Sequence, residues 1–212
     1  MRTDFCRELC CGHCGLPPPA VIRCNASEAA ALAAACKSET EASAALAARV
    51  AAWAAESFAF GDHDGPTAAK GADSTAQWYQ ALPQAVALAA QTGSVVAVTG
   101  AVDVVVSVDG SSGCRVGLCE NGHELLTRIT AAGCALSAVC GAAVAAQKGS
   151  PFDAVLGALS AYGSAGEAGA ESCGAALGPG SLRAALIDQL WLSGPDEAGR
   201  RERVTVRDFA LA

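Results

Sequence analysis

The sequence predicts an α/β protein in which a partly parallel β-sheet packs with helices. Residues 94–99 (SVVAVT) form an uninterrupted, largely β-branched run, which is typical of a strand buried on both faces of a parallel sheet. Alanine-rich stretches with helical periodicity precede and follow that run. Two alternating segments, 103–108 and 114–119, surround a glycine-containing turn and predict a β-hairpin.

Composition limits the class of protein. A chain of 212 residues makes one domain or two small ones, and a hydrophobic content of 52% with 17% charged residues supports a sizeable core. The net charge of −7 argues against nucleic acid and anionic membrane surfaces as partners, because both require clustered Lys and Arg.

Two long uncharged stretches, 75–102 and 129–147, raise the question of a membrane span. The first is interrupted by Pro83, Gly93 and Gly100, and the second is rich in small residues with little Leu or Phe to drive insertion. Both therefore indicate the interior of a soluble protein. The first residues lack the apolar core of a signal peptide, so a cytoplasmic location is expected, with any organellar signal lying upstream.

The chain has 11 cysteines, which are expected to be reduced thiols in the absence of a secretory signal. Several of them, with one histidine, cluster near the N-terminus: Cys6, Cys10, Cys11, His13 and Cys14. A zinc site usually needs two ligand pairs at a set separation, and the second pair is missing. A metal-binding module remains an alternative interpretation of this cluster.

The first half of the chain is predicted to alternate between helices and strands. Short helices are expected at 3–11 and 29–36, and a buried strand at 20–23. Residues 37–70 differ in character, with an alanine-rich helix at 40–55 and a Gly/Pro loop at 58–66. A further helix is expected to end near residue 90. Pro83 lies within it and is expected to kink it or split it in two.

The stretch around Cys134 has the most chemical meaning. A polar segment, 121–130, is expected to be extended and to enter a small-residue turn before an apolar helix at 135–146 that looks buried. The first N–H groups of a helix have no partner within it and lie at its positive end, so such a turn can bind phosphate. A thiol in the first helical turn ionises more readily than one in water. The alternative is a buried helix start with an inert cysteine.

The last third is predicted to be helical. Ser150 and Pro151 start a helix that continues to about residue 171, and another follows residues 178–183 and runs to about Trp191. Residues 195–212 are expected to form a polar tail, with a late strand near Val204 as the alternative.

Several separated motifs resemble the hydroxyethylthiazole kinase family, and they occur in the family's order. The central motif consists of Asn-Gly-His at 121–123, Thr-Arg-Ile-Thr at 127–130 and the Gly-Cys pair at 133–134 that opens a small-residue helix. Further segments also resemble motifs of the family: VIRCNASE at 21–28, GADS at 71–74, Thr99-Gly100 with Asp103, YGSAGE at 162–167 and GPGSLR at 178–183.

The resemblance implies a ribokinase-like fold with a mixed, mostly parallel sheet flanked by helices. It implies a single kinase domain over 1–194 with an alanine-rich insertion at about 37–70. The first residue of this chain corresponds to a position well inside the family's domain. The N-terminal strands, much of the thiazole pocket and an aspartate linked to magnesium are therefore expected to be missing.

The resemblance also implies an activity and roles. The hydroxyl of 5-(2-hydroxyethyl)-4-methylthiazole would accept the ATP γ-phosphoryl group, with Mg²⁺, in an enzyme that forms homotrimers. Cys134 occupies the position of the catalytic base, and Arg23 and Thr99 the ATP-binding positions. Glu28 would orient Mg²⁺ through water. The remaining residues form the substrate and anion turn: Ala131, Ala132 and Gly133.

The anion turn departs from the family's Gly-Thr-Gly-Cys. Ala131 places a Cβ where glycine can adopt conformations that alanine resists, and Ala132 removes a hydroxyl. Phosphoryl transfer depends on positioning and charge stabilisation, so weakened activity is expected. The alternative is a catalytically inactive fragment or paralogue that acts in binding or assembly.

Overall fold

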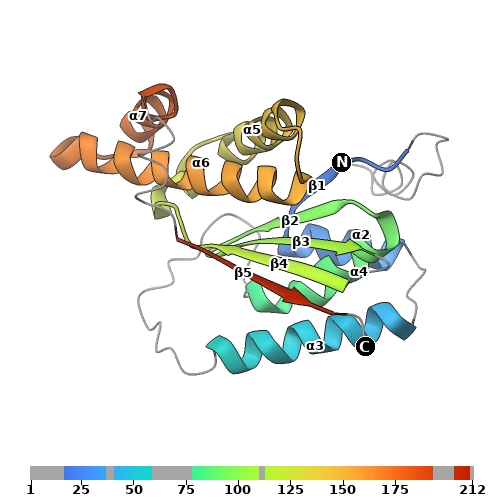
Figure 1. Ribbon diagram of the computed structural model, residues 1–212. Helices are drawn as coiled ribbons and strands as arrows, with labels where there is room; N and C mark the ends of the chain where they lie inside the picture. The colour runs from blue at the N-terminus through green and yellow to red at the C-terminus, as the bar shows by residue number, and fades with distance from the viewer. Residues whose placement is uncertain (1–16, 37–40, 59–77, 110–112, 193–202, 211–212) are drawn as a thin grey trace. The chain divides into compact units, whose positions relative to one another are not determined.

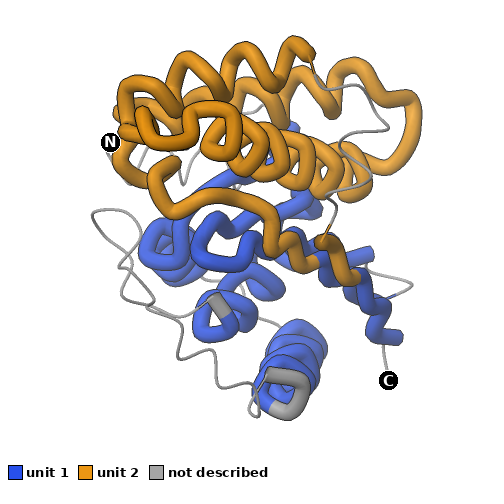
Figure 2. Tube along the Cα trace, turned by 90° about the vertical axis from the view of Figure 1, so that its left-hand side faces the viewer, with its two compact units in different colours: residues 1–117, 206–212 blue, residues 118–205 orange. Residues whose placement is uncertain are grey.

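The computed structural model describes residues 17–36, 41–58, 78–109, 113–192 and 203–210. These residues divide into two compact units, coloured separately in Figure 2. Unit 1 comprises residues 1–117 and 206–212, and unit 2 comprises residues 118–205. The N-terminal cysteine cluster, the 58–66 loop after its first residue and the GADS motif lie outside the described residues.

A five-stranded sheet runs in the order β1-β2-β3-β4-β5 (Figure 1). The strands are β1 Val21–Asn25, β2 Val95–Thr99, β3 Asp103–Asp109, β4 Gly113–Cys119 and β5 Val204–Phe209. β1 pairs with β2 in parallel and β2 with β3 antiparallel, so the sheet is mixed, as predicted. Only three residues link β2 to β3, too few for a parallel crossover, and the described strands do not show a parallel majority.

The helices of unit 1 are α2 Ala26–Ala35, α3 Glu41–Phe58 and α4 Leu82–Thr92, with a short 3₁₀ helix η1 at Trp78–Gln80. α4 packs against β2 and β3, and its apolar face is fully buried at Leu82, Val86 and Leu88. Pro83 lies in the first turn of α4, where its missing N–H costs nothing, so the proline separates η1 from α4. The left-handed Gly93 ends α4.

The C-terminal segment forms β5 rather than an entirely loose tail, and it packs on α3 within unit 1. The rings of Phe209 and Trp53 meet edge to face at 5.4 Å between centroids. Arg49 donates a hydrogen bond of 2.6 Å from Nη1 to the Ala210 carbonyl. Phe209 is buried, so the strand contributes to the core of unit 1.

Unit 2 is mainly helical. Its elements are η2 Glu124–Arg128, α5 Ala132–Ala146, α6 Pro151–Cys173, η3 Gly174–Ala176 and α7 Pro179–Leu192. α6 packs against both α5 and α7. Its core cluster joins Ile129, Ala170 and Leu182, with four partly buried residues around them: Leu125, Leu126, Ala132 and Leu177.

Three local expectations in unit 2 were wrong. The 121–130 segment is not extended throughout, because η2 forms within it, capped by His123 Nδ1 accepting from the Leu125 N–H. α5 is not buried all round, since only Leu136 and Cys140 are buried along it. Ser150 occupies the N-cap position of α6, but its side chain makes no capping hydrogen bond.

Candidate functional site

Thr99 is the last residue of β2, and Arg23 lies in the middle of β1, the strand that pairs with β2 in parallel and continues two residues beyond the predicted end at Arg23. The β1–β2 register places Arg23 opposite Ala97 and Asn25 opposite Thr99. Arg23 Nη2 donates a hydrogen bond of 2.5 Å to Thr99 Oγ1, whose hydroxyl is 3.4 Å from the Cys24 carbonyl. The carboxyl ends of parallel strands are where open α/β sheets bind ligands, and the bond to Thr99 brings the Arg23 guanidinium to that end of β2.

The Arg23 guanidinium has donors to spare. Its Nε is buried and makes no hydrogen bond within the part of the chain that the structure describes. A buried donor without a partner is uncommon in folded proteins, and a bound anion would satisfy it. Guanidinium groups bind phosphate through two parallel hydrogen bonds, which makes Arg23 suited to a nucleotide phosphate.

Glu28 has a structural role at the start of α2. Asn25 Oδ1 accepts from the Glu28 N–H at 2.8 Å, and Glu28 Oε2 accepts from the Asn25 N–H at 2.9 Å, which is a capping box. The side chain is exposed, and its second carboxylate oxygen makes no hydrogen bond among the described residues. A single free carboxylate oxygen fits a hydrated Mg²⁺ held mainly by substrate phosphates.

The turn after Thr99 is fixed by Asp103. The Gly100 N–H donates to Asp103 Oδ1 at 2.9 Å, three residues along the chain. This bond closes the turn that follows β2 and orients the backbone next to Thr99. The aspartate of the Thr-Gly-x-x-Asp motif therefore stabilises the turn, a role that was not predicted from the sequence.

The anion turn begins at a strained residue. Ala131 has φ 66° and ψ 13° and is the N-cap of α5. Among the described residues it is the one non-glycine residue with positive φ. The left-handed region costs an L-residue with a Cβ about 1–2 kcal/mol. The expectation that position 131 suits glycine better than alanine is thus confirmed by the backbone conformation.

The start of α5 offers three backbone amides, those of Ala132, Gly133 and Cys134, and one of them already donates a hydrogen bond. The Ala132 N–H donates to the Ile129 carbonyl at 3.2 Å, while those of Gly133 and Cys134 have no acceptor among the described residues. Both free N–H groups belong to the first turn of α5, where the helix dipole favours an anion. Cys134 is exposed in the same turn, so its thiol is accessible.

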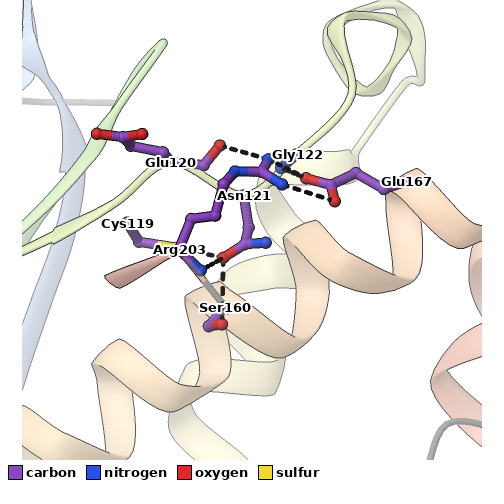
Figure 3. Close-up of polar contacts among 7 residues, drawn as sticks. All are labelled: Cys119, Glu120, Asn121, Gly122, Ser160, Glu167 and Arg203. Atoms are coloured by element: carbon purple, nitrogen blue, oxygen red, sulfur yellow. Dashed lines mark hydrogen bonds and ion pairs between the residues drawn. The ribbon is translucent and has the colours of Figure 1, made fainter. Parts of the chain in front are cut away.

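A polar network around Asn121 holds the segment that leads to the anion turn (Figure 3). Buried Asn121 uses its Oδ1 to accept from Arg203 N at 2.9 Å and Ser160 Oγ at 3.3 Å. Glu167 Oε1 accepts from the Gly122 N–H at 2.6 Å and from Arg203 Nη2 at 2.5 Å. All of these residues belong to unit 2.

Sequence reasoning missed the roles of this network and of Tyr162, whose hydroxyl donates to the Ala132 carbonyl at 3.0 Å. The YGSAGE motif that contains Tyr162 and Glu167 was visible, but a motif on one helix does not state which loop it contacts. Nothing in the sequence indicated that Arg203 bonds to this network, because it lies in a stretch predicted to be a polar tail.

The proposed site residues divide between the units. Arg23, Glu28 and Thr99 belong to unit 1, whereas residues 131–134 belong to unit 2. No three His, Cys, Asp or Glu side chains gather into a metal site within the described ranges. Across those ranges, no helix combines the length and apolar character needed to cross a bilayer.

One cysteine outside the site has a perturbed pKa. Burial, and secondarily the nearby Asp208 carboxylate, raises the pKa of Cys114 to about 12. Cys114 lies in β4 at 3% exposure and stays a neutral thiol at physiological pH. It behaves as an inert core residue, in contrast to the exposed Cys134.

The sequence model of the hydroxyethylthiazole kinase family matches residues 54–193. The chain belongs to this family. A hydroxyethylthiazole kinase from Cereibacter sphaeroides is 43% identical over 138 residues, which cover 65% of this chain and 49% of the relative. One from Tolumonas auensis is 36% identical over 193 residues, 90% of this chain and 56% of the relative.

A solved structure supports the same family. The hydroxyethylthiazole kinase protein from Pyrococcus horikoshii OT3 superimposes with a TM-score of 0.59 and 27% sequence identity, covering 89% of this chain and 55% of that chain. The chain thus spans about half the length of the family members it matches. The family match begins inside the predicted 37–70 insertion, which includes α3.

Proposed function

We propose that this chain transfers the γ-phosphoryl group of ATP to the hydroxyl of 5-(2-hydroxyethyl)-4-methylthiazole, a step of thiamine salvage. Membership of the hydroxyethylthiazole kinase family supports the substrate and reaction. The observation that carries the proposal is the turn before α5, where two unpartnered amides and an exposed thiol share one helical turn. The amides can stabilise charge on the transferring phosphoryl group, and the thiol can take the proton of the acceptor hydroxyl.

The proposed roles follow from the local geometry. Arg23 binds ATP phosphate oxygens through its unused N–H donors, while Thr99 orients the guanidinium. The amides of Gly133 and Cys134 stabilise the charge on the transferring group. As the substrate oxygen bonds to the γ-phosphorus, its proton passes to the thiolate form of Cys134 to give the thiol, and the bond from the γ-phosphorus to the β–γ bridging oxygen breaks, which releases ADP.

Mg²⁺ is part of the proposal as the usual companion of ATP, and it would neutralise phosphate charge. Glu28 is the described residue that would hold it, through water, with its free carboxylate oxygen. The capping box fixes the direction of that side chain at the start of α2. The homotrimer implied by the family resemblance stays a prediction for analytical ultracentrifugation.

The test is a direct assay of the full chain with the thiazole alcohol, ATP and Mg²⁺. Mass spectrometry should detect the phosphate ester of the thiazole and an equal amount of ADP. The analogue 5-ethyl-4-methylthiazole, which lacks the hydroxyl, is the matched control and should give no ester. ADP release without ester would contradict the proposed kinase and leave the inactive or binding protein as the interpretation.

A further inference from the structure

A side chain of α6, Tyr162, donates a hydrogen bond to the backbone of the anion turn. We propose that Tyr162 is a positioning residue: its hydroxyl fixes the Ala132 carbonyl and thereby holds the Gly133 and Cys134 amides in the geometry that phosphoryl transfer requires. The inference rests on the proposed function for its catalytic meaning. Its structural content, the fixing of the turn by Tyr162, can be tested without turnover.

The turn needs support from outside itself. Ala131 adopts a left-handed conformation that alanine avoids, and such residues persist only when neighbouring structure over-determines them. Two hydrogen bonds within the turn are local, Ala132 N–H to Ile129 O at 3.2 Å and Ala135 N–H to Ala131 O at 2.9 Å. Both belong to the same short segment, so neither anchors the turn to the rest of unit 2.

Tyr162 supplies that anchor. It lies thirty positions from Ala132 in the sequence and is 4% exposed. Its Oη donates to the Ala132 carbonyl at 3.0 Å, and Ala132 is the first residue of α5. A hydrogen bond from a buried side chain is costly to lose, because water does not readily replace it. The bond therefore opposes movement of the strained turn.

Tyr162 is one of several residues on α6 that contact the segment leading to the turn. A Cβ at Gly163 would lie 2.6 Å from the Asn121 backbone, and one at Gly166 would lie 2.8 Å from a Leu126 methyl. Glu167 accepts the Gly122 N–H. The YGSAGE motif thus forms a template that fixes successive parts of residues 121–132, ending with Tyr162 at the turn itself.

The first measurement is hydrogen–deuterium exchange of the full chain and its Tyr162→Phe variant, followed on peptides covering 129–136. Loss of the hydroxyl should raise exchange there about three- to tenfold, while peptides from the middle of α7 stay unchanged. Adding Ala131→Gly should return exchange toward the wild-type rate, because glycine removes the strain that the tyrosine opposes.

Two controls separate positioning from general loosening. Ser160→Ala removes another buried α6 hydroxyl, one that bonds Asn121 rather than the turn. Tyr79→Phe removes the hydroxyl of the other tyrosine in the chain. Unchanged exchange at 129–136 in Tyr162→Phe would overturn the inference. So would an equal rise in α7, or the same rise in Ser160→Ala.

Steady-state kinetics of Tyr162→Phe test whether fixing the turn matters for turnover. In a chain that turns over, Tyr162→Phe should lower kcat about three- to tenfold and leave the KM for ATP within about twofold. A wild-type kcat in the variant would overturn the positioning role even if exchange rises. If the wild-type chain forms no thiazole phosphate, the proposed function fails, and the exchange result alone decides whether Tyr162 fixes the turn.

Discussion

The two groups of proposed site residues are built by different physical means. In unit 1, Arg23 and Thr99 would act through side chains that project from two paired strands and bond to each other. In unit 2, the turn at 131–134 would act largely through backbone amides, and a hydrogen bond from α6 reaches its Ala132 carbonyl. A side-chain site tolerates small backbone shifts through rotamer changes, whereas a backbone site does not, so the two should respond differently to substitution.

The contrast also concerns stability. Neither residue of the Arg23–Thr99 pair has a positive φ, whereas the anion turn contains the strained Ala131. Functional sites often retain such strain when the surrounding structure holds it. The Tyr162 hydroxyl provides a contact of that kind at the turn itself. The network of Asn121, Glu167 and Arg203 holds the segment that leads to the turn (Figure 3).

The largest effect is expected from Cys134→Ala. If the thiol takes the substrate proton, kcat for the thiazole alcohol should fall about 10²- to 10⁴-fold, because a positioned base contributes that much. ATP affinity, measured by titration calorimetry, should stay within about twofold, since the proposed ATP-binding side chains, Arg23 and Thr99, belong to unit 1. Cys173→Ala, which removes a half-buried thiol at the end of α6, is the control. Equal kcat in Cys134→Ala would remove the base assignment.

Arg23→Ala should produce the converse result. Loss of a charged donor to phosphate should weaken ATP binding about 10- to 100-fold, while the reactivity of the Cys134 thiol toward iodoacetamide stays unchanged. Thr99→Val should weaken binding less, because it frees the guanidinium without removing it. The control is Arg183→Ala, an exposed arginine on α7. ATP binding equal to that of the wild type in Arg23→Ala would show that the unit 1 group is not a nucleotide site.

Glu167→Ala tests how much the network around Asn121 contributes to the free energy of unfolding. The variant loses the acceptor of the Gly122 N–H and the partner of Arg203, and the Glu167 side chain is 15% exposed. Urea denaturation should show a loss of about 2 kcal/mol, since hydrogen bonds to a partly buried charge are worth that much. Asp188→Ala, an exposed carboxylate on α7, should change stability by less than about 0.5 kcal/mol. Similar values for the two variants would refute a supporting role.

The smallest effect is expected from Ala131→Gly, and its sign is the informative part. Glycine relieves the left-handed strain, so the free energy of unfolding should rise by about 1 kcal/mol. Ala138→Gly makes the same substitution at an exposed helical position of α5 and should lower it by about 1 kcal/mol. Thermal denaturation of both variants checks the pair. A destabilised Ala131→Gly would mean that the turn is not strained.

Much of the fold was predictable from local patterns. The β-branched run at 95–99, the hairpin strands and the long helices each carry their own periodicity, and the structure places elements there. The capping residues around Asn25 and Glu28 were visible as a strand-to-helix turn, although not as a reciprocal capping box. The exposed faces of α5 were not predictable, because an all-apolar, small-residue helix gives no periodic signal for which side faces a neighbour.

The sequence by itself determined the family, the order of the elements and the residue types of the candidate site, because these depend on local composition and motif spacing. Tertiary structure decided three further things. It paired Arg23 with Thr99 across 76 positions, joined Arg203 to Asn121 and Glu167, and placed the Tyr162 hydroxyl on the anion turn. Such contacts join residues far apart in the chain, and only the packing of strands and helices brings them within hydrogen-bonding distance.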